Sequence, residues 1–280
     1  MPASPDYPEL EEGRRHWRYQ PAANCLKDQV ILVTGAGDGI GSAAARTFSL
    51  YGAHVILLGR TRSKLEAVFD WITARTDTEP VIVPCDLQAL NDDSADALLA
   101  AVDEGFGRLD GILHNASLLG PKVAVAHYPS DEWRRVMHVN AYAPFVLTKA
   151  LLPLLQQSPN ASVVMTSSSV GRQGRAYWGA YAVSKFALEG LSQVLADEHE
   201  NVNRVRFNSL NPGATRTAMR ATAYPGENPR QVPTPESKMD IYLYLFEAAS
   251  AGLTGAQLDA RDWNGPGRDW NGPGAPASPG

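Results

Sequence analysis

The sequence contains only two cysteines, Cys25 and Cys85, among its 280 residues. Two cysteines so far apart cannot form a disulfide framework, so we expect two reduced thiols in a cytoplasmic protein. Basic residues are not in excess either, since 25 lysines and arginines face 30 aspartates and glutamates, a formal net charge of −5. Without a basic surface the chain is poorly suited to phosphate backbones, which argues against a nucleic-acid-binding protein.

Long apolar segments are also missing. The most apolar stretch, residues 141–155, is too short to span a bilayer and contains Lys149. The pair Arg14-Arg15 is followed by polar and charged residues where an export signal needs an apolar segment. These absences predict a protein that neither crosses nor binds a membrane and stays in the cytoplasm.

Glycine and proline are concentrated at the two ends of the chain. Residues 1–24 lack any period and are rich in proline and charge, which predicts a mobile arm or a strap laid over the domain. The heptad RDWNGPG fills residues 261–267 and is repeated directly afterwards. Such a composition cannot build a core, so residues 261–280 are predicted to be a disordered tail with two exposed tryptophans, and residues 25–260 a single domain.

Within that domain, seven short β-branched or aliphatic runs alternate with segments of helical period. Because the runs are apolar on both faces, the pattern predicts an α/β domain with a parallel, doubly wound sheet of seven strands. The runs are Val30–Val33, Val55–Leu58, Val81–Val83, Gly111–Leu113, Ser162–Met165, Val205–Leu210 and Gln257–Leu258. The predicted helices are Ile40–Tyr51, Ser63–Thr76, Ser94–Gly105, Asp131–Leu155, Tyr181–Glu200 and Lys238–Ala249.

A glycine-rich turn joins the first predicted strand to the first helix, with Gly35, Gly39 and Gly41 in the spacing Gly-x-x-x-Gly-x-Gly. Backbone N–H groups at a helix N-terminus attract anions, and the missing Cβ atoms let a pyrophosphate come close. A plain tight turn is the alternative. Asp38 inside the turn should weaken anion binding unless its side chain caps the helix. The expected cofactor contacts are Gly35, Gly37, Asp38, Gly39, Ile40 and Gly41.

The second predicted strand ends in Gly59 and Arg60, where a cofactor without a 2′-phosphate would need an acidic residue. The guanidinium of Arg60 suits a 2′-phosphate, so NADP(H) is favoured over NAD(H). The alternative is that Arg60 and Arg62 only line a solvated turn.

A serine-rich segment that includes Ser168 closes the fifth predicted strand, at the edge of the sheet where ligands of open α/β sheets bind. Tyr181 and Lys185 follow, four residues apart, so a helix places the phenol and the ammonium on one face. A phenol has an ordinary pKa of about 10, and a nearby cation lowers that pKa by favouring the phenolate. The pair is thus a candidate acid–base group.

Together these residues resemble the short-chain dehydrogenase/reductase family over about residues 28–260, and the segments ILLGR, LDGILHNA and WGAYAVSKFA resemble its uncharacterised YciK-type bacterial branch. The resemblance implies a Rossmann-type domain that transfers hydride between NADP(H) and a carbonyl or alcohol carbon. It implies that Tyr181 is the acid–base group, that Lys185 lowers its pKa and binds the nicotinamide ribose, and that Ser168 positions the substrate. Asn140 would hold a relay water. The implied cofactor contacts are Asp86, Leu87, Asn115, Ala116, Tyr181, Lys185, Pro212, Gly213, Thr215 and Thr217. A homodimer or homotetramer is implied as well.

Pro144, near the expected site, leaves two alternatives open. Pro144 cannot donate to the carbonyl of Asn140, so that carbonyl is free to hold a water if residues 131–155 form one helix; otherwise Pro144 starts a second helix. Ser117 stands where the family usually has glycine, so a side chain occupies a place where glycine normally permits close approach. His114, His127 and His138 are spread over separate segments, so no metal site is expected.

The substrate is not indicated by any motif. Residues 218–236 contain four prolines and predict a long loop that covers the site. Arg216, Arg220 and Arg230 could attract an anionic substrate, although solvated arginines are the simpler interpretation. The leading hypothesis is an NADPH-dependent carbonyl reductase. A regulator that binds NADP without turnover is the alternative from another class, and an isomerase or dehydratase on the same fold is disfavoured.

Overall fold

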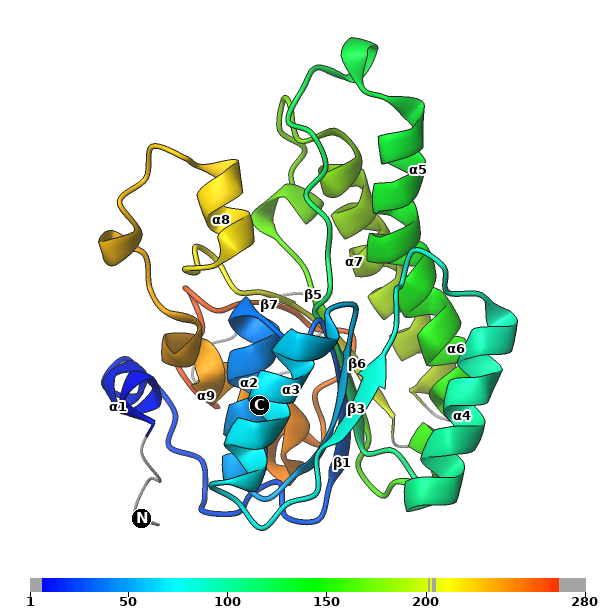
Figure 1. The fold of residues 1–280 in the computed structure, drawn as a ribbon, viewed down its shortest axis with the longest axis vertical. Coiled ribbons are helices and arrows are strands. Elements are labelled where there is room, and N and C mark those ends of the chain that lie inside the picture. The colour runs from blue at the N-terminus through cyan, green and yellow to red at the C-terminus, as the bar shows by residue number, and fades with distance from the viewer. Residues whose placement is uncertain (1–6, 201, 203–204, 267–280) are drawn as a thin grey trace, which may run out of the picture.

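The computed structural model describes residues 7–200, 202 and 205–266. Seven parallel strands form one twisted sheet in the order β3-β2-β1-β4-β5-β6-β7 (Figure 1). The chain crosses over between β3 and β4, so the carboxyl ends of β1 and β4 diverge and leave room for a ligand. The strands are β1 Val30–Thr34, β2 His54–Gly59, β3 Val81–Pro84, β4 Gly111–His114, β5 Ser162–Thr166, β6 Arg206–Asn211 and β7 Gln257–Asp259. All seven predicted strands are confirmed.

Helices cover both faces of this sheet, as the apolar runs predicted (Figure 1). The helices α2 Gly39–Leu50, α3 Arg62–Thr73 and α9 Met239–Phe246 lie on one face. The helices α4 Asp92–Phe106, α6 Ala143–Gln157 and α7 Gly179–His199 lie on the other. Each layer contributes its own buried apolar cluster, and the strands β1, β2, β4 and β5 supply residues to both clusters.

The long helical segment predicted over residues 131–155 is observed as three consecutive pieces. Helix α5, Ser130–Met137, passes into a π-helical turn, His138–Tyr142, and then into α6. The N–H of Ala143 donates to the carbonyl oxygen of His138, five residues earlier, so the ladder shifts by one residue just before Pro144. Pro144 then occupies the first turn of α6, where its missing N–H costs little.

The N-terminal segment is a strap, the second of the two alternatives predicted for it. Its helix α1, Pro8–Arg14, packs against the 3₁₀ turn η5, Pro235–Lys238. A Cβ on Gly13 would lie 2.6 Å from the backbone of Glu236, so glycine allows this close approach. The Trp17 indole N–H donates to the Glu236 carbonyl oxygen over 2.9 Å. The strap therefore holds the segment in which the predicted loop over the site ends.

The described part of the C-terminal segment packs onto the domain, which differs from the expected tail. Trp263 is buried, with ring centroids 6.2 Å from Tyr19 and 5.6 Å from Tyr244. The Arg18 guanidinium donates to the carbonyl oxygens of Arg261 and Trp263. The first heptad was expected to expose its tryptophan, but the strap supplies a surface for it. The second heptad lies outside the described residues.

Residues 218–236 are only partly a loop. They contain the helix α8, Ala218–Ala223, and the 3₁₀ turn η4, Pro229–Gln231, before the chain reaches η5. Thr217 caps α8, since its hydroxyl accepts from the N–H of Arg220 over 3.1 Å. Three short 3₁₀ turns elsewhere are η1 Val125–His127, η3 Ser169–Gly171 and η6 Ala248–Ser250. No helix among the described residues has the length and apolar character needed to cross a membrane.

Candidate active site

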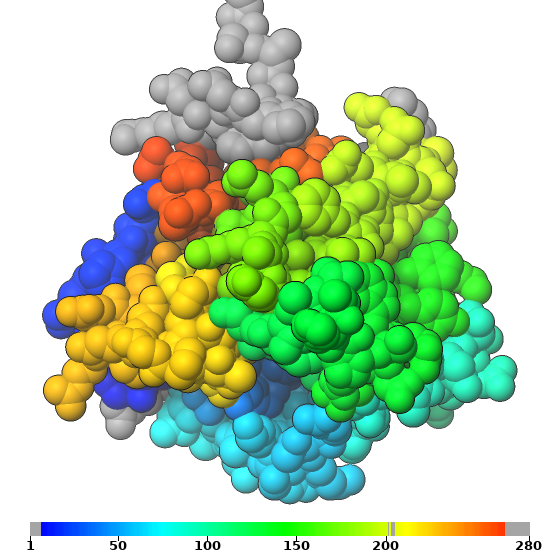
Figure 2. Space-filling view, turned by 90° about the horizontal axis from the view of Figure 1, so that it is seen from above, coloured from blue at the N-terminus to red at the C-terminus, as the bar shows by residue number. Residues whose placement is uncertain are grey.

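A cavity of about 520 Å³ opens at the carboxyl edge of the sheet. In Figure 2 the segment after β6 (yellow) and the segment before α5 (green) meet above the more deeply placed blue and cyan segments. Every residue predicted to touch the cofactor or to react lines this cavity except Gly41 and Asn140. The sheet thus brings together side chains from seven separate stretches of sequence.

The glycine turn is shaped by close backbone contacts. Gly35 and Gly39 have φ angles of +69° and +51°, which side chains rarely adopt. A Cβ on Gly41 would lie 2.2 Å from the carbonyl oxygen of Gly35 and 2.7 Å from the side-chain nitrogen, Nδ2, of Asn115. Gly41 is therefore needed for packing within the turn, and the first residues of α2, Gly39 and Ile40, line the cavity.

Asp38 is the helix cap that the sequence left as an option. Its carboxylate accepts from the N–H of Gly39 over 2.7 Å and forms an ion pair with Lys64. The hydrogen bond from Lys64 lowers the pKa of Asp38. Because Lys64 compensates the carboxylate, the negative charge in the turn is a smaller obstacle to an anion than the sequence suggested.

Arg60 lies at the rim of the cavity where β2 ends. Its neighbour Arg62 pairs with Glu66 over 2.8 Å. Within the described residues Arg60 itself has no ion-pair partner. Asp86 and Leu87, after β3, line the same end of the cavity. This end therefore offers one uncompensated guanidinium, which suits a phosphate.

The turn after β4 is fixed by Thr34 at the end of β1. The Thr34 hydroxyl accepts from the N–H groups of Asn115 and Ala116 over 2.9 and 3.0 Å. The Asn115 side chain in turn donates to the Thr34 carbonyl oxygen. These bonds join the two central strands where they diverge, and they hold Asn115 and Ala116 against the glycine turn.

Tyr181 and Lys185 share one face of α7, as their spacing predicted. The Lys185 ammonium donates to the Thr166 carbonyl oxygen over 2.7 Å and lies 5.5 Å from the centre of the Tyr181 ring. Burial lowers the pKa of Lys185 to about 8 and raises the pKa of Tyr181 to about 12, although a hydrogen bond with Ser168 opposes the latter. Burial is thus the largest influence on both groups, and it shifts the pKa of Tyr181 in the direction opposite to that expected from a nearby cation.

A buried carboxylate lies one helical turn beyond Lys185. Glu189 accepts from Arg172 over 3.0 Å and from the Ser209 hydroxyl over 2.5 Å. Its charge raises the pKa of Lys185 and so opposes the effect of burial. Sequence reasoning missed Glu189, although its spacing of four residues from Lys185 places it on the same helix face.

Asn140 is fully buried beside the cavity and does not line it. Its side-chain oxygen accepts from the N–H of Leu118 over 2.7 Å, and its side-chain nitrogen donates to the Leu118 carbonyl oxygen and to the Ser184 hydroxyl. The side chain therefore positions the segment after β4 against α7, which carries Tyr181.

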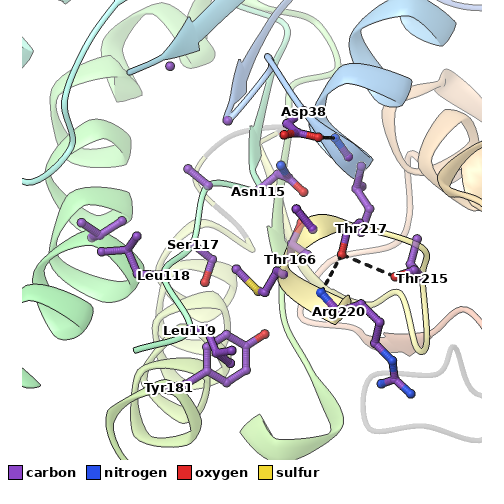
Figure 3. A pocket seen from close by; sticks show the side chains of 18 of the residues that line it. Asp38, Asn115, Ser117, Leu118, Leu119, Thr166, Tyr181, Thr215, Thr217 and Arg220 are labelled. Carbon is purple, nitrogen blue, oxygen red and sulfur yellow. Dashed lines mark hydrogen bonds between the residues drawn. The ribbon is translucent and has the colours of Figure 1, made fainter. Parts of the chain in front are cut away.

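The cavity is also lined by four residues that follow β6: Pro212, Gly213, Thr215 and Thr217. The N–H of Gly213 donates to the Asn211 side chain over 3.0 Å. Figure 3 shows the Thr217 hydroxyl between Thr215 and Arg220, with its methyl side toward the glycine turn. A Cβ on Gly39 would lie 3.0 Å from that methyl carbon, so this segment closes over the turn.

Sequence reasoning missed the apolar wall next to Tyr181. Trp178, Tyr224, Met219 and Leu119 form one apolar cluster with Tyr181. Trp178 precedes Tyr181 by three residues, a helical spacing that could have identified it. The residues of α8 carried no comparable signal, because only the tertiary structure brings them to α7.

The fold and this cavity define a nucleotide-binding α/β oxidoreductase. The family model for short chain dehydrogenases matches residues 29–228, and the chain belongs to that family. It is 49% identical over 249 residues to the uncharacterized oxidoreductase YciK of Escherichia coli (strain K12), covering 89% of this chain and 98% of that protein.

Two solved structures show the same likeness. A putative short chain dehydrogenase from Pseudomonas syringae is 53% identical, with a TM-score of 0.85, and the match covers 86% of this chain and 98% of that one. A putative short chain dehydrogenase from Shigella flexneri, complexed with NADP, is 49% identical, with a TM-score of 0.83 over 86% of this chain and all of the other. The predicted family and fold are thereby confirmed.

Proposed function

We propose that this protein is an NADPH-dependent carbonyl reductase with Tyr181 as its proton donor. The observation that carries the proposal is the buried phenol of Tyr181 beside Lys185, in the same cavity as the N-terminus of α2 and Arg60. A binding module needs the helix N-terminus and the arginine. It has no need of a phenol and an ammonium held in one cleft.

The cavity fits a phosphorylated dinucleotide. The glycine turn would hold the pyrophosphate, because Gly35, Gly37 and Gly39 line the cavity without side chains at the N-terminus of α2. Arg60 would bind the 2′-phosphate. Asp86 and Leu87 would flank the adenine, and Asn115 and Ala116 the adjoining ribose. The complex of the Shigella flexneri relative with NADP supports this choice of cofactor.

The reacting groups suit reduction. NADPH, when bound, supplies a hydride to the carbonyl carbon of the substrate. Tyr181 gives its proton to the carbonyl oxygen, which Ser168 holds by a hydrogen bond, and the product is an alcohol. Lys185 stabilises the phenolate that remains, and a water on the Asn140 carbonyl would return a proton from solvent. With the pKa of Tyr181 at about 12, the proton to be donated is present at neutral pH.

Tyr181→Phe tests the assignment. The variant should bind NADPH within about twofold of wild type, measured by cofactor fluorescence, because only the hydroxyl is removed. Turnover on a carbonyl panel should fall at least 100-fold. Retained turnover would show that Tyr181 is not the proton donor. If wild type binds NADPH but reduces no aldehyde, ketone, quinone or acyl thioester, the regulator hypothesis is supported instead.

Arg60→Ala tests the cofactor. Removing a charged hydrogen-bond donor should cost about 1.5–3 kcal/mol, or roughly 10- to 150-fold in NADPH affinity, with little change for NADH. Arg62→Ala is the matched control, since Arg62 pairs with Glu66 and should affect the two cofactors alike. Tighter binding of NADH than NADPH by wild type would contradict the proposal.

We also propose a homodimer or homotetramer. Phe145 on α6 and Phe186 on α7 are 43% and 45% exposed, and such aromatic surface favours association between copies. Sedimentation of wild type against Phe186→Glu measures this directly, and a monomeric wild type would contradict it.

A further inference from the structure

We propose that the substrate is a neutral, apolar carbonyl compound that carries a hydrophobic ring. This inference rests on the proposed function and names its substrate class. It depends on two observations: where the cavity places its charged side chains, and which side chains pack against the Tyr181 ring.

The charged side chains of the cavity are gathered at its cofactor end. Six described residues with charged side chains line it: Asp38, Arg60, Lys64, Asp86, Lys185 and Arg220. The first four follow β1, β2 and β3 or lie on α3, away from Tyr181. Lys185 is only 2% exposed and is bonded to the Thr166 carbonyl oxygen. We call residues 218–236, which contain α8 and η4, the lid. Arg220 is thus the one described cation of the lid that a substrate in this cavity could meet.

Arg220 is already compensated. Its guanidinium donates twice to Glu227, over 2.7 and 2.6 Å, and its central carbon lies 3.8 Å from the centre of the Tyr224 ring. Figure 3 shows the side chain running away from Tyr181. Arg216 and Arg230, the other two arginines considered for an anionic substrate, line a separate cavity behind the lid. An anionic substrate next to Tyr181 would therefore be buried without a free cation, which is costly.

The surface around the Tyr181 ring is apolar and aromatic. The Trp178 ring lies 5.7 Å from the Tyr181 ring and 5.9 Å from the Tyr224 ring, and Leu119 and Met219 pack against the same cluster. In Figure 3, Leu119 lies directly beside the labelled Tyr181 ring. A carbonyl bonded to the hydroxyl must extend its remaining atoms over this wall, where a hydrophobic ring makes more favourable contacts than a polar chain.

The lid is held against this wall from outside. Lys122, before η1, donates to the Ala223 carbonyl oxygen over 2.8 Å, and its ammonium lies 4.7 and 4.9 Å from the centres of the Trp178 and Tyr224 rings. Lys122 does not line the cavity. Its charge therefore fixes the aromatic pair in place and leaves the inner surface apolar.

A matched pair of substrates tests the inference. Benzaldehyde and 4-formylbenzoate differ by one carboxylate, and wild type should reduce the neutral member with at least tenfold higher kcat/KM under saturating NADPH. Glu227→Gln removes the charge that compensates the Arg220 guanidinium, so it should lower the ratio of the two kcat/KM values by about tenfold. Glu132→Gln, which alters an Arg–Glu pair on α5, should leave the preference unchanged.

Two outcomes are kept apart by a binding measurement that needs no turnover. Tyr181→Phe saturated with NADPH should bind benzaldehyde more tightly than 4-formylbenzoate in calorimetry. If that order holds and wild type reduces neither compound nor any other member of the carbonyl panel, the proposed reductase function fails and the ligand class stands. If 4-formylbenzoate binds or reacts as well as benzaldehyde, the ligand class is wrong, whatever the activity.

Discussion

Gly41→Ala is the substitution that most directly tests the packing of the glycine turn. The new methyl carbon would lie 2.2 Å from the Gly35 carbonyl oxygen and 2.7 Å from the Asn115 side-chain nitrogen, where ordinary contacts begin at 3.4 Å. The oxygen belongs to the backbone of the same turn, so the turn must open by more than 1 Å. Overpacking of this kind costs about 1–3 kcal/mol.

The cost should appear in two measurements. Denaturant titration should show a loss of about 1–3 kcal/mol in the free energy of unfolding. Cofactor fluorescence should show at least a tenfold weaker affinity for NADPH, because the N–H groups of the opened turn no longer converge. A variant with wild-type stability and wild-type affinity would refute the reasoning, since it would show that the turn yields without cost.

Gly105→Ala is the matched control. Gly105 lies in α4, its φ angle is not positive, and a Cβ there would meet no atom within 4 Å. Because alanine loses less backbone entropy in a helix, this variant should gain about 0.5–1 kcal/mol of stability and bind NADPH normally. If the free energy of unfolding falls in Gly41→Ala and rises in Gly105→Ala, the loss is due to the packing of the turn and not to alanine in general.

Three further outcomes are expected. Burial lowers the pKa of His114 to about 3, so between pH 6.5 and pH 5 the His114 imidazole gains a proton only in the unfolded chain. The free energy of unfolding should therefore fall by ~2 kcal/mol over this range in an acid titration, and His114→Asn should reduce that loss. Glu189→Gln removes the charge that raises the pKa of Lys185, so the alkaline limb of the kcat/KM profile should move to lower pH; an unmoved limb would contradict the link. Trp263→Ala should lower the free energy of unfolding by about 3 kcal/mol in denaturant titration, whereas an exposed tryptophan would cost almost nothing.

The sheet and the cofactor end of the site were predictable because their signals are local. An apolar run predicts each strand, and Gly35, Gly39 and Gly41 lie within a stretch of seven residues. Tyr181 and Lys185 needed only the helical period. Where a site is formed by the backbone of one turn or by one face of a helix, a few neighbouring residues are enough to predict it.

The remainder depended on contacts between distant segments. Trp263 sits in a heptad whose composition indicates disorder, yet Tyr19 and Tyr244 bury it. The pKa of Tyr181 is set by burial rather than by its nearest cation, and burial cannot be read from spacing. Arg220 was a candidate for an anionic substrate until its pairing with Glu227 became visible. Tertiary packing decided all three.

The bonds from Arg18 to Arg261 and Trp263 join the two ends of the described chain at one corner of the molecule. An unfolding machine that pulls on either terminus meets this junction before it reaches the sheet. Breaking it separates the strap from Trp263, so the two ends lose their mutual support in one event. Resistance to processive degradation would then be set at the corner, far from the cofactor.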